Sequence, residues 1–384
     1  MNIEDLKAEI IAYSKEIGID KIGFTTADPF VELKERLRRQ QELGYQSGFE
    51  KGTIEERTEP RLLFPDAQSI ISIAVAYPAK MENAPKSTRG DRRGVFCRAS
   101  WGIDYHDALK ERLSKLSDFI KSKETEFTGK LMVDTGELVD KAVAERAGIG
   151  FGGKNTLLIT PEFGSYVYLG ELITNIPFTP DEPLEDSCGD CTICIDVCPT
   201  GAIVQGGQLD SKRCIAFLTQ VKDFVPEEFR DKIGNRLYGC DTCQAVCPRN
   251  RHVDFHLHAD LEPEPEIVKP QLKPILKMSN RQFKETYGHM AGSWRGKKPI
   301  QRNAIIALGV YKDNTAIDEL IEILVNDPRP VMRGTAAWSL GKIGTDAALI
   351  AISEAKEREA DDQVLYEIDL ALNKLEGGAA SNAR

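Results

Sequence analysis

The stretch that decides the fold of this 384-residue chain is Cys188-Gly-Asp-Cys191-Thr-Ile-Cys194-Ile-Asp-Val-Cys198-Pro199. A second run, Cys240-Asp-Thr-Cys243-Gln-Ala-Val-Cys247-Pro248, closes a window that holds eight of the nine cysteines. The N-terminus is acidic where a signal peptide would be basic, and no apolar stretch approaches the roughly 20 residues that span a bilayer. We therefore expect a cytoplasmic protein with no membrane contact, in which CxxC spacing indicates metal ligands rather than disulfides.

The first run has the spacing with which bacterial ferredoxins bind [4Fe–4S] clusters. In that pattern three cysteines hold one cluster and the fourth holds its neighbour. Zinc is the main alternative, but a zinc ribbon needs little more than two CxxC pairs. Here there are eight cysteines, and a proline follows both Cys198 and Cys247. These features favour two [4Fe–4S] clusters over zinc.

The second run lacks one cysteine of a fully duplicated pattern, because Leu237 stands where that cysteine would be. Cys214 is the remaining candidate within the window and completes the set of eight. Cys97 is left over, either as a small buried hydrophobic side chain or as a thiol near the reactive centre. The predicted ligands are Cys188, Cys191, Cys194 and Cys247 for one cluster, and Cys198, Cys214, Cys240 and Cys243 for the other.

The segments on either side of the window differ in pattern. Strand and helix patterns alternate before it, with strands expected at 21–25, 69–77, 130–133 and 165–174 and helices at 104–120 and 138–147. After it, Ala304-x3-Leu308-Gly309 recurs 32 residues later as Ala336-x3-Leu340-Gly341, which is typical of stacked helical pairs. We expect an α+β protein with three parts. They are an α/β domain over residues 1–180, a ferredoxin-like module with two clusters over 181–262, and an all-α HEAT-like repeat domain over 263–384.

The charge is unevenly distributed along the chain. The net charge is −10, yet the segment from Val268 to Arg302 contains nine basic residues and one acid, Glu285. Such a basic segment in an acidic chain is a candidate binding surface for a polyanion. A solvated surface or a linker is the other interpretation, and charge alone does not decide between them.

Several segments, taken in order, resemble the epoxyqueuosine reductase family. They are Val133-Asp-Thr-Gly136, the run Ala147-Gly-Ile-Gly-Phe-Gly-Gly-Lys-Asn-Thr-Leu-Leu-Ile159, the cysteine window and the helical tail. The resemblance covers essentially the whole chain. It implies a cobalamin-dependent oxidoreductase, related to reductive dehalogenases, that catalyses the last step of queuosine biosynthesis. In that step the epoxide of epoxyqueuosine at the tRNA wobble position is reduced to the alkene of queuosine.

The resemblance also implies which residues form the site. Cobalamin would bind base-off between the N-terminal domain and the cluster module, and its Co(I) form would open the strained ring. Asp134 would protonate the departing oxygen as a general acid, a role that suits a raised pKa. From the residues alone, Asp134 reads as a turn residue at the end of a strand. The residues expected to bind cobalamin or substrate are Arg57, Cys97, Asp134, Lys154, Asn155 and Leu158.

With this resemblance the basic segment gains an expected partner, the tRNA anticodon stem-loop that bears epoxyqueuosine. Its phosphate backbone requires clustered lysine and arginine side chains. The residues expected to bind tRNA are Lys222, Arg281, Arg295, Lys297, Lys298 and Arg302. Electrons would come from an external donor such as a ferredoxin or flavodoxin, and nothing in the sequence demands more than a monomer.

Two other functions are compatible with the clusters. A reductive dehalogenase shares the cofactors, but that class is usually exported with a twin-arginine signal and has no reason for a basic helical tail. A ferredoxin-type electron-transfer protein would relay electrons to a partner docked on the tail. An absorbance spectrum showing cobalamin without its lower ligand excludes the pure relay, and turnover of an epoxyqueuosine-bearing stem-loop separates the first two.

Neutralising Arg295, Lys297 and Lys298 together is expected to lower tRNA affinity, because these side chains would contact phosphates. Cobalamin binding and cluster content should stay at the wild-type level. A binding assay at fixed ionic strength measures the effect, and unchanged tRNA affinity would contradict the assignment.

Overall fold

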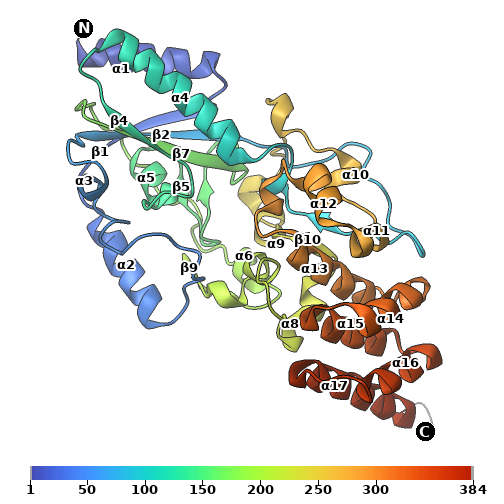
Figure 1. The fold of residues 1–384 in the computed structure, drawn as a ribbon. Coiled ribbons are helices and arrows are strands. Elements are labelled where there is room, and N and C mark those ends of the chain that lie inside the picture. Colours follow the sequence, from blue (N-terminus) through green and yellow to red (C-terminus); the bar gives the residue numbers. More distant parts are fainter. Residues whose placement is uncertain (1, 382–384) are drawn as a thin grey trace. The chain divides into compact units, whose positions relative to one another are not determined.

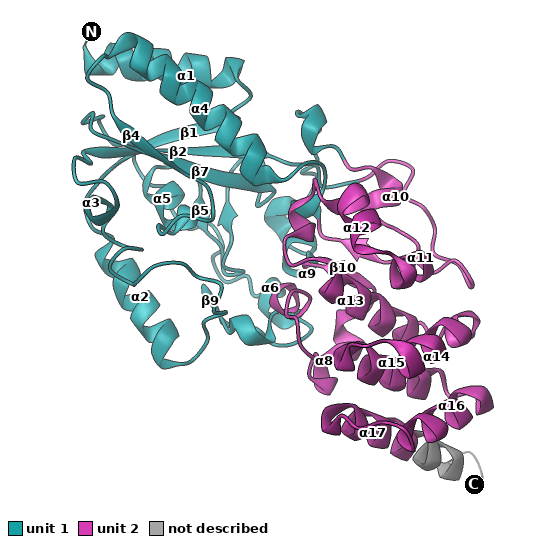
Figure 2. Ribbon diagram, in the orientation of Figure 1, with its two compact units in different colours: residues 1–80, 98–214, 241–262 teal, residues 81–97, 215–240, 263–384 magenta. Residues whose placement is uncertain are grey.

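The computed structural model describes residues 2–381 (Figure 1). The chain forms two compact units, each built from several segments (Figure 2). The first unit comprises residues 1–80, 98–214 and 241–262, and the second comprises 81–97, 215–240 and 263–384. The second unit therefore includes two segments, 81–97 and 215–240, that precede the helical tail in the sequence.

A four-stranded sheet forms the centre of the first unit. Its order is β1 (Lys21–Thr26), β2 (Ser69–Ala76), β7 (Val167–Thr174) and β4 (Gly129–Met132). All four predicted strands are confirmed, but every pair of neighbours is antiparallel. This corrects the expected α/β domain to α+β. Alternating strands and helices give a parallel sheet only when each helix returns the chain to the same end of the sheet, and here paired strands run in opposite directions.

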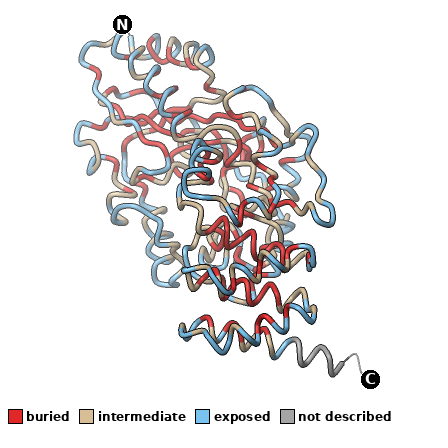
Figure 3. The backbone as a smooth tube through the Cα atoms, turned by 45° about the vertical axis from the view of Figure 1, so that its right-hand side comes forward, coloured by how far each residue is buried: buried red, intermediate tan, exposed pale blue. Residues whose placement is uncertain are grey.

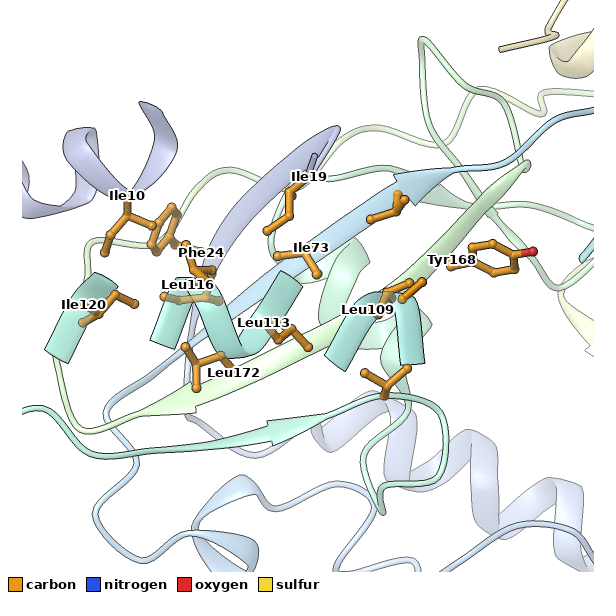
Figure 4. Packing of buried hydrophobic residues seen from close by; sticks show 14 of the residues in the cluster. Ile10, Ile19, Phe24, Ile73, Leu109, Leu113, Leu116, Ile120, Tyr168 and Leu172 are labelled. Carbon is orange, nitrogen blue, oxygen red and sulfur yellow. The ribbon is translucent and has the colours of Figure 1, made fainter. Parts of the chain in front are cut away.

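The two faces of this sheet bury different cores. Successive residues of a strand point to opposite faces, so Ile71 and Ile73 of β2 pack on one side, and Ile70 packs on the other. The first side is covered by α1 (Ile3–Glu16) and α4 (Tyr105–Lys123), as Figure 4 shows. The second side is covered by α5 (Asp140–Arg146).

Shorter elements complete the first unit. The glycine-rich run forms a hairpin of β5 (Phe151–Gly152) and β6 (Leu158–Ile159). The cysteine window contributes two short helices that pack on each other, α6 (Ile193–Asp196) and α9 (Thr242–Ala245). The others are α2 (Val31–Glu42), α3 (Pro60–Leu63), β8 (Ile203–Gln205) and β9 (Gln208–Leu209).

The second unit contains the helical repeat. Its longer helices are α13 (Lys297–Val310), α14 (Ile317–Asn326), α15 (Pro330–Ile343), α16 (Asp346–Lys356) and α17 (Asp362–Ser381). One row of contacts joins α13, α15 and α17, and another joins α14 and α16. The predicted offset of 32 reappears in the packing: a Cβ added to Gly309 would lie 2.8 Å from Ser339, and one added to Gly341 would lie 2.9 Å from Ala371. The repeat therefore places glycine at the close contact between successive helices.

A parallel pair of short strands, β3 (Val95–Phe96) and β10 (Arg236–Tyr238), joins two distant segments of the second unit. Its remaining helices are α7 (Ile215–Leu218), α8 (Glu227–Ile233), α10 (Pro265–Val268), α11 (Leu272–Lys277) and α12 (Asn280–Tyr287). Buried residues follow the sheet of the first unit and the repeat helices of the second (Figure 3). In the described residues, no helix is long and apolar enough to cross a membrane.

Breaking the buried ion pair of Arg230 and Glu367 is expected to destabilise the second unit strongly. The two side chains are 2% and 5% exposed, and Arg230 Nη1 donates to Glu367 Oε2 at 2.6 Å. Glu367→Ala leaves a buried guanidinium without its anion, which costs roughly 3–5 kcal/mol. Urea unfolding measures this loss. Glu285→Ala, which removes an exposed i,i+4 pair with Arg281, is the control and should cost about 0.5 kcal/mol or less; equal effects would contradict the prediction.

Candidate active site and cluster ligands

Asp134 lies in the loop that joins the edge strand β4 to α5. Its backbone is left-handed, with φ at +48°, a conformation that is uncommon for a residue with a Cβ. The backbone N–H of Asp134 donates to Asp140 Oδ2 at 2.9 Å, and its side chain is 59% exposed. The hydrogen bond to Asp140 thus holds the backbone of Asp134 against α5, while the Asp134 carboxylate stays accessible to solvent.

His106, which the sequence did not single out, contacts this carboxylate. Its Nε2 lies 3.2 Å from Asp134 Oδ2, and its Nδ1 lies 2.7 Å from Asp104 Oδ1. Asp104 is also the N-cap of α4 and accepts a hydrogen bond from the backbone N–H of His106. One imidazole therefore bridges two carboxylates. The capping aspartate was visible in the sequence as the start of a helix, but the contact with Asp134 depends on how α4 packs beside β4.

The bridge changes the pKa values of its members. Burial lowers the pKa of His106, but hydrogen bonds to Asp104 and Asp134 outweigh burial and raise the pKa to about 9. The hydrogen bond from His106 holds the pKa of Asp134 below its ordinary value, although burial opposes this. The adjacent imidazolium stabilises the Asp134 carboxylate, whereas the raised pKa expected for a general acid belongs to a pocket covered by the corrin and stays a prediction. Near neutral pH the proton resides on His106.

Asn155 lies in the turn of the β5–β6 hairpin and is only 4% exposed. Its Oδ1 accepts a hydrogen bond from the backbone N–H of Leu157. Its buried Nδ2 has no acceptor among the described residues. Leaving a buried donor unpaired costs about 1–3 kcal/mol, and a ligand with a polar acceptor would remove that cost. Asn155 therefore fits the role predicted for it at a cofactor.

The other predicted pocket residues of the first unit are in different environments. Leu158 is buried in β6. Arg57 is partly buried, and this burial lowers the pKa of its guanidinium while Glu50 opposes the change. Lys154 lies against the first cysteine run: its Nζ donates to the carbonyl of Gly189. The hairpin that carries Lys154 and the segment that carries the first cysteines are therefore neighbours.

Cys188, Cys191, Cys194 and Cys247 are brought close together in the first unit. Burial raises the pKa of the Cys194 thiol, and the thiols of Cys247, Cys188 and Cys191 raise it further. Burial also raises the pKa of Cys188, with Cys247 among the other causes. A thiol whose ionisation is opposed by three others must lie near each of them. Bound iron would stabilise all of them as thiolates, so this group fits the ligand set predicted for one cluster.

The second predicted set is distributed over more elements. Cys198 is followed by a turn whose backbone N–H groups, from Ile203, Thr200 and Ala202, outweigh the effect of burial and lower its pKa. Hydrogen bonds of this kind favour a thiolate ligand. Cys214 follows a short 3-10 helix and Cys243 lies in α9, both in the first unit, whereas Cys240 belongs to the second. In the described residues, no group of three or more His, Cys, Asp or Glu side chains forms a site for a single metal ion.

Cys97, which the sequence assigned to neither cluster, lies beside Gly239 in the second unit. Its backbone N–H donates to the carbonyl of Tyr238 at 2.9 Å, which extends the pairing of β3 with β10. A Cβ added to Gly239 would lie 2.2 Å from Cys97 Sγ. Position 239 therefore requires glycine on steric grounds. This contact places the Cys97 thiol next to the residue that precedes Cys240.

The residues predicted to bind tRNA all belong to the second unit. Trp294 Nε1 donates to Gln220 Oε1 at 2.8 Å, and Arg295 Nε donates to the Gln220 carbonyl at 3.2 Å. These contacts hold Arg295 beside the loop that carries the exposed Lys222. Lysines or arginines from two distant parts of the sequence thus contribute to one surface.

Arg302 does not belong to that surface. Its side chain is 1% exposed, and its guanidinium donates to the carbonyls of Leu218, Val221 and Asp223. The prediction that Arg302 binds tRNA is therefore wrong. The local sequence shows that Arg302 lies in a basic segment. The packing of α13 buries its side chain, and the guanidinium hydrogen-bonds to the backbone of residues 218–223.

Family models match three parts of the chain. A 4Fe-4S double cluster binding domain matches residues 187–250, and HEAT repeats match 296–373. The class is therefore an iron–sulfur protein with a helical repeat domain, as the sequence predicted. The model described as "Epoxyqueuosine reductase QueG, DUF1730" matches residues 57–135, the segment that ends just after Asp134.

Full-length relatives define the family. The chain is 64% identical over 375 residues to epoxyqueuosine reductase of Bacillus cereus, covering 98% of this chain and 99% of that protein. It is 62% identical, with a TM-score of 0.96, to a crystal structure of epoxyqueuosine reductase with a tRNA-Tyr epoxyqueuosine-modified tRNA stem loop, covering 98% and 100%. A Bacillus subtilis epoxyqueuosine reductase with its Asp134 catalytic loop swung out of the active site is 61% identical, with a TM-score of 0.95, covering 97% and 100%. This chain belongs to the epoxyqueuosine reductase family.

Replacing His106 with glutamine is expected to change how stability depends on pH. The folded pKa of His106, about 9, lies above its ordinary value of 6.5. The stabilisation from this group is therefore complete below about pH 6.5 and is lost as pH rises through about 9. Relative to His106→Gln, the wild type should lose on the order of 1–2 kcal/mol of unfolding free energy across that range, a value reduced for the exposure of Asp134. Urea unfolding at pH 6 and pH 9.5 measures the difference. The exposed His289→Gln is the control, and parallel curves for wild type and His106→Gln would contradict the prediction.

Proposed function

We propose that this chain reduces the epoxide of epoxyqueuosine in tRNA to the alkene of queuosine, the last step of queuosine biosynthesis. Family membership over nearly the whole chain carries this conclusion. A relative in the same family was solved with an epoxyqueuosine-modified tRNA stem loop. The loop of Asp134 and the cysteine groups supply the remaining support, because they match the acid and the electron carriers that such a reduction requires.

The proposed cofactors are base-off cobalamin and two [4Fe–4S] clusters. When bound and reduced, cobalamin supplies the nucleophilic and electron-donating chemistry that opens the strained ring. Asn155 would donate through its unpaired Nδ2, with Arg57, Lys154, Leu158 and Cys97 as the other proposed contacts. The effects of the Cys247, Cys188 and Cys191 thiols on Cys194 support the first cluster set. The proposed ligands are Cys188, Cys191, Cys194 and Cys247 for one cluster, and Cys198, Cys214, Cys240 and Cys243 for the other.

Conversion of an epoxide to an alkene and water consumes two electrons and two protons. Asp134 is proposed to deliver a proton to the departing oxygen as a general acid. In the protein without ligands that proton is held on His106, 3.2 Å away. Covering the carboxylate with substrate and cofactor removes water, which raises the pKa of Asp134 and favours transfer of the proton from His106 to Asp134. Asp104 then keeps the imidazole oriented toward Asp134.

The second unit is proposed to bind the anticodon stem-loop. The proposed contacts are Lys222, Arg281, Arg295, Lys297 and Lys298, without the buried Arg302. In functional terms residues 1–180 would carry the acid and cobalamin contacts, 181–262 the clusters and 263–384 the tRNA surface. An external donor such as a ferredoxin or flavodoxin would supply electrons to a monomer in the cytoplasm, where tRNA is modified.

Asp134→Asn is the direct test of the proposed acid. The amide keeps the size of the side chain but cannot supply the proton, so turnover should fall by about 10²–10⁴-fold. Single-turnover conversion of an epoxyqueuosine-bearing stem-loop with a chemical reductant measures the rate, while absorbance spectra confirm unchanged cobalamin and cluster content. A wild-type rate in this variant would end the general-acid proposal. Conversion of an aryl halide but not of the stem-loop by the wild type would favour a dehalogenase instead.

A further inference from the structure

Glu171 is a carboxylic acid in the middle of the sheet. Its side chain is 0% exposed, and its register partners are Ser72 of β2 and Met132 of β4. Strand alternation places Glu171 on the face covered by α5, because its neighbours Tyr168 and Leu172 pack on the α4 face. Neither Glu171 oxygen accepts a hydrogen bond from an N–H or O–H group fixed in the described structure, and the hydroxyl of Ser72 is also unpaired. An ionised carboxylate in this position would be strongly disfavoured.

The neighbour of Glu171 is the carboxyl group of Asp140, at the start of α5. The helix α5 packs on β7, and the charge of Asp140 acts on Glu171, so the two carboxyl groups lie near each other. Two carboxylates have only acceptors, so a hydrogen bond between them would require a shared proton. Burial, together with the charge of Asp134, raises the pKa of Asp140 to about 6, although the backbone N–H of Asp134 and the Glu171 side chain oppose the change. Burial and the charge of Asp140 raise the pKa of Glu171 well above its ordinary value. Paired carboxyls of this kind retain one proton to higher pH than either would alone.

The groups around the pair offer no compensating cation among the described residues. Asp134 is the further charged group that acts on both members. The basic side chains of the nearest elements are engaged elsewhere. Lys130 of β4 pairs with Glu137, and the charge of Glu145 acts on Lys141 of α5. Arg146 of α5 donates to Thr25 and to the Asp28 carbonyl.

The position of the proton follows from the hydrogen bonds. Asp140 Oδ2 accepts the N–H of Asp134 at 2.9 Å, which favours an ionised Asp140. Glu171 has no such donor, so it is the protonated member. A proton on Glu171 would let Asp140 accept from Glu171 on one side, while it accepts from the Asp134 backbone on the other. This second bond holds a residue whose left-handed backbone conformation is unfavourable for a side chain with a Cβ.

We propose that Asp140 and Glu171 are positioning residues that share one proton and, through the bond from Asp140 to the Asp134 backbone, hold the Asp134 loop in place for proton transfer. This inference rests on the proposed role of Asp134. With the proton present, Asp140 is satisfied from both sides. When the proton is lost, two buried carboxylates face each other next to Asp134, and their repulsion releases the loop. A related structure has its Asp134 catalytic loop swung out of the active site, so this loop can leave the site in that protein.

Infrared spectroscopy of the full-length protein tests the shared proton directly. Glu171→Gln is the key variant, because its amide donates permanently to Asp140 and is nearly isosteric with a protonated glutamate. At neutral pH the wild type should show the C=O stretch of a protonated carboxylic acid, and Glu171→Gln should lack it. Glu111→Gln, on the exposed surface of α4, is the matched control and should keep the band. Identical spectra for wild type and Glu171→Gln would overturn the shared proton.

Hydrogen exchange of the segment that contains Asp134 tests the positioning. After correction for intrinsic rates, wild-type protection should fall at least tenfold as pH rises through the upper titration of the pair, whereas Glu171→Gln should stay protected. Asp140→Ala should lose this protection at every pH, while the rest of the sheet stays protected and shows that the variant is folded. Wild-type protection in Asp140→Ala, or the same loss at high pH in Glu171→Gln, would overturn the positioning role.

Turnover measurements distinguish the positioning role of Asp140 and Glu171 from the general-acid role of Asp134 on which it rests. Asp140→Ala should lower turnover at least tenfold with unchanged KM for the stem-loop. Glu171→Gln should turn over at the wild-type rate at neutral pH, and its turnover should fall less than that of the wild type as pH rises. If Asp134→Asn is fully active while the infrared and exchange results hold, the acid role fails and the carboxyl pair stands. If Asp134→Asn is inactive and Asp140→Ala is fully active with an unprotected loop, the positioning proposal fails and the acid role stands.

Discussion

The antiparallel pairing of β2 with β7 is the constraint on which the first unit depends. Eight residues of each strand are in register, from Ser69 with Thr174 to Ala76 with Val167. One face of this pair supplies the apolar core under α4, and the other supplies the surface on which α5 packs. Because β4 pairs with the free edge of β7, the loop after β4 is carried to a fixed place between the ends of α4 and α5. A shift of one residue in this register would exchange the two faces and separate Asp134 from His106.

Around Asp134 the fold concentrates ionisable groups that differ in how they hold protons. His106 sits between two carboxylates and keeps its proton to about pH 9. Asp134 is stabilised as an anion by that imidazolium. On the other side of the loop, the buried pair of Asp140 and Glu171 is proposed to retain a proton, since no cation within the described residues offsets its charge. The carboxylate that is proposed to work as an acid therefore lies between one group that can return its proton and another that holds its backbone.

The cysteine segment serves a different requirement, the storage of electrons. The thiols of Cys247, Cys188 and Cys191 raise the pKa of Cys194, and bound iron would stabilise the group as thiolate ligands. The Lys154 side chain anchors the glycine-rich hairpin to Gly189 of the same segment. Asn155, the next residue, keeps an unpaired donor for a ligand. A buried polar atom without a partner is costly in an empty site and useful in an occupied one.

Spacing along the chain was sufficient to predict the features that depend on local geometry. The cysteine intervals indicate a 4Fe-4S cluster binding domain. The period of apolar residues predicts the strands and helices, and the 32-residue repeat predicts which glycines meet the next helix. Asp134 was found through its flanking motif. Tertiary packing alone decided the antiparallel sheet, the contact of His106 with Asp134, the buried position of Arg302 and the pairing of Asp140 with Glu171. Each of these features depends on contacts between residues that are distant in the sequence. The local pattern around a residue does not show which other element will pack against it.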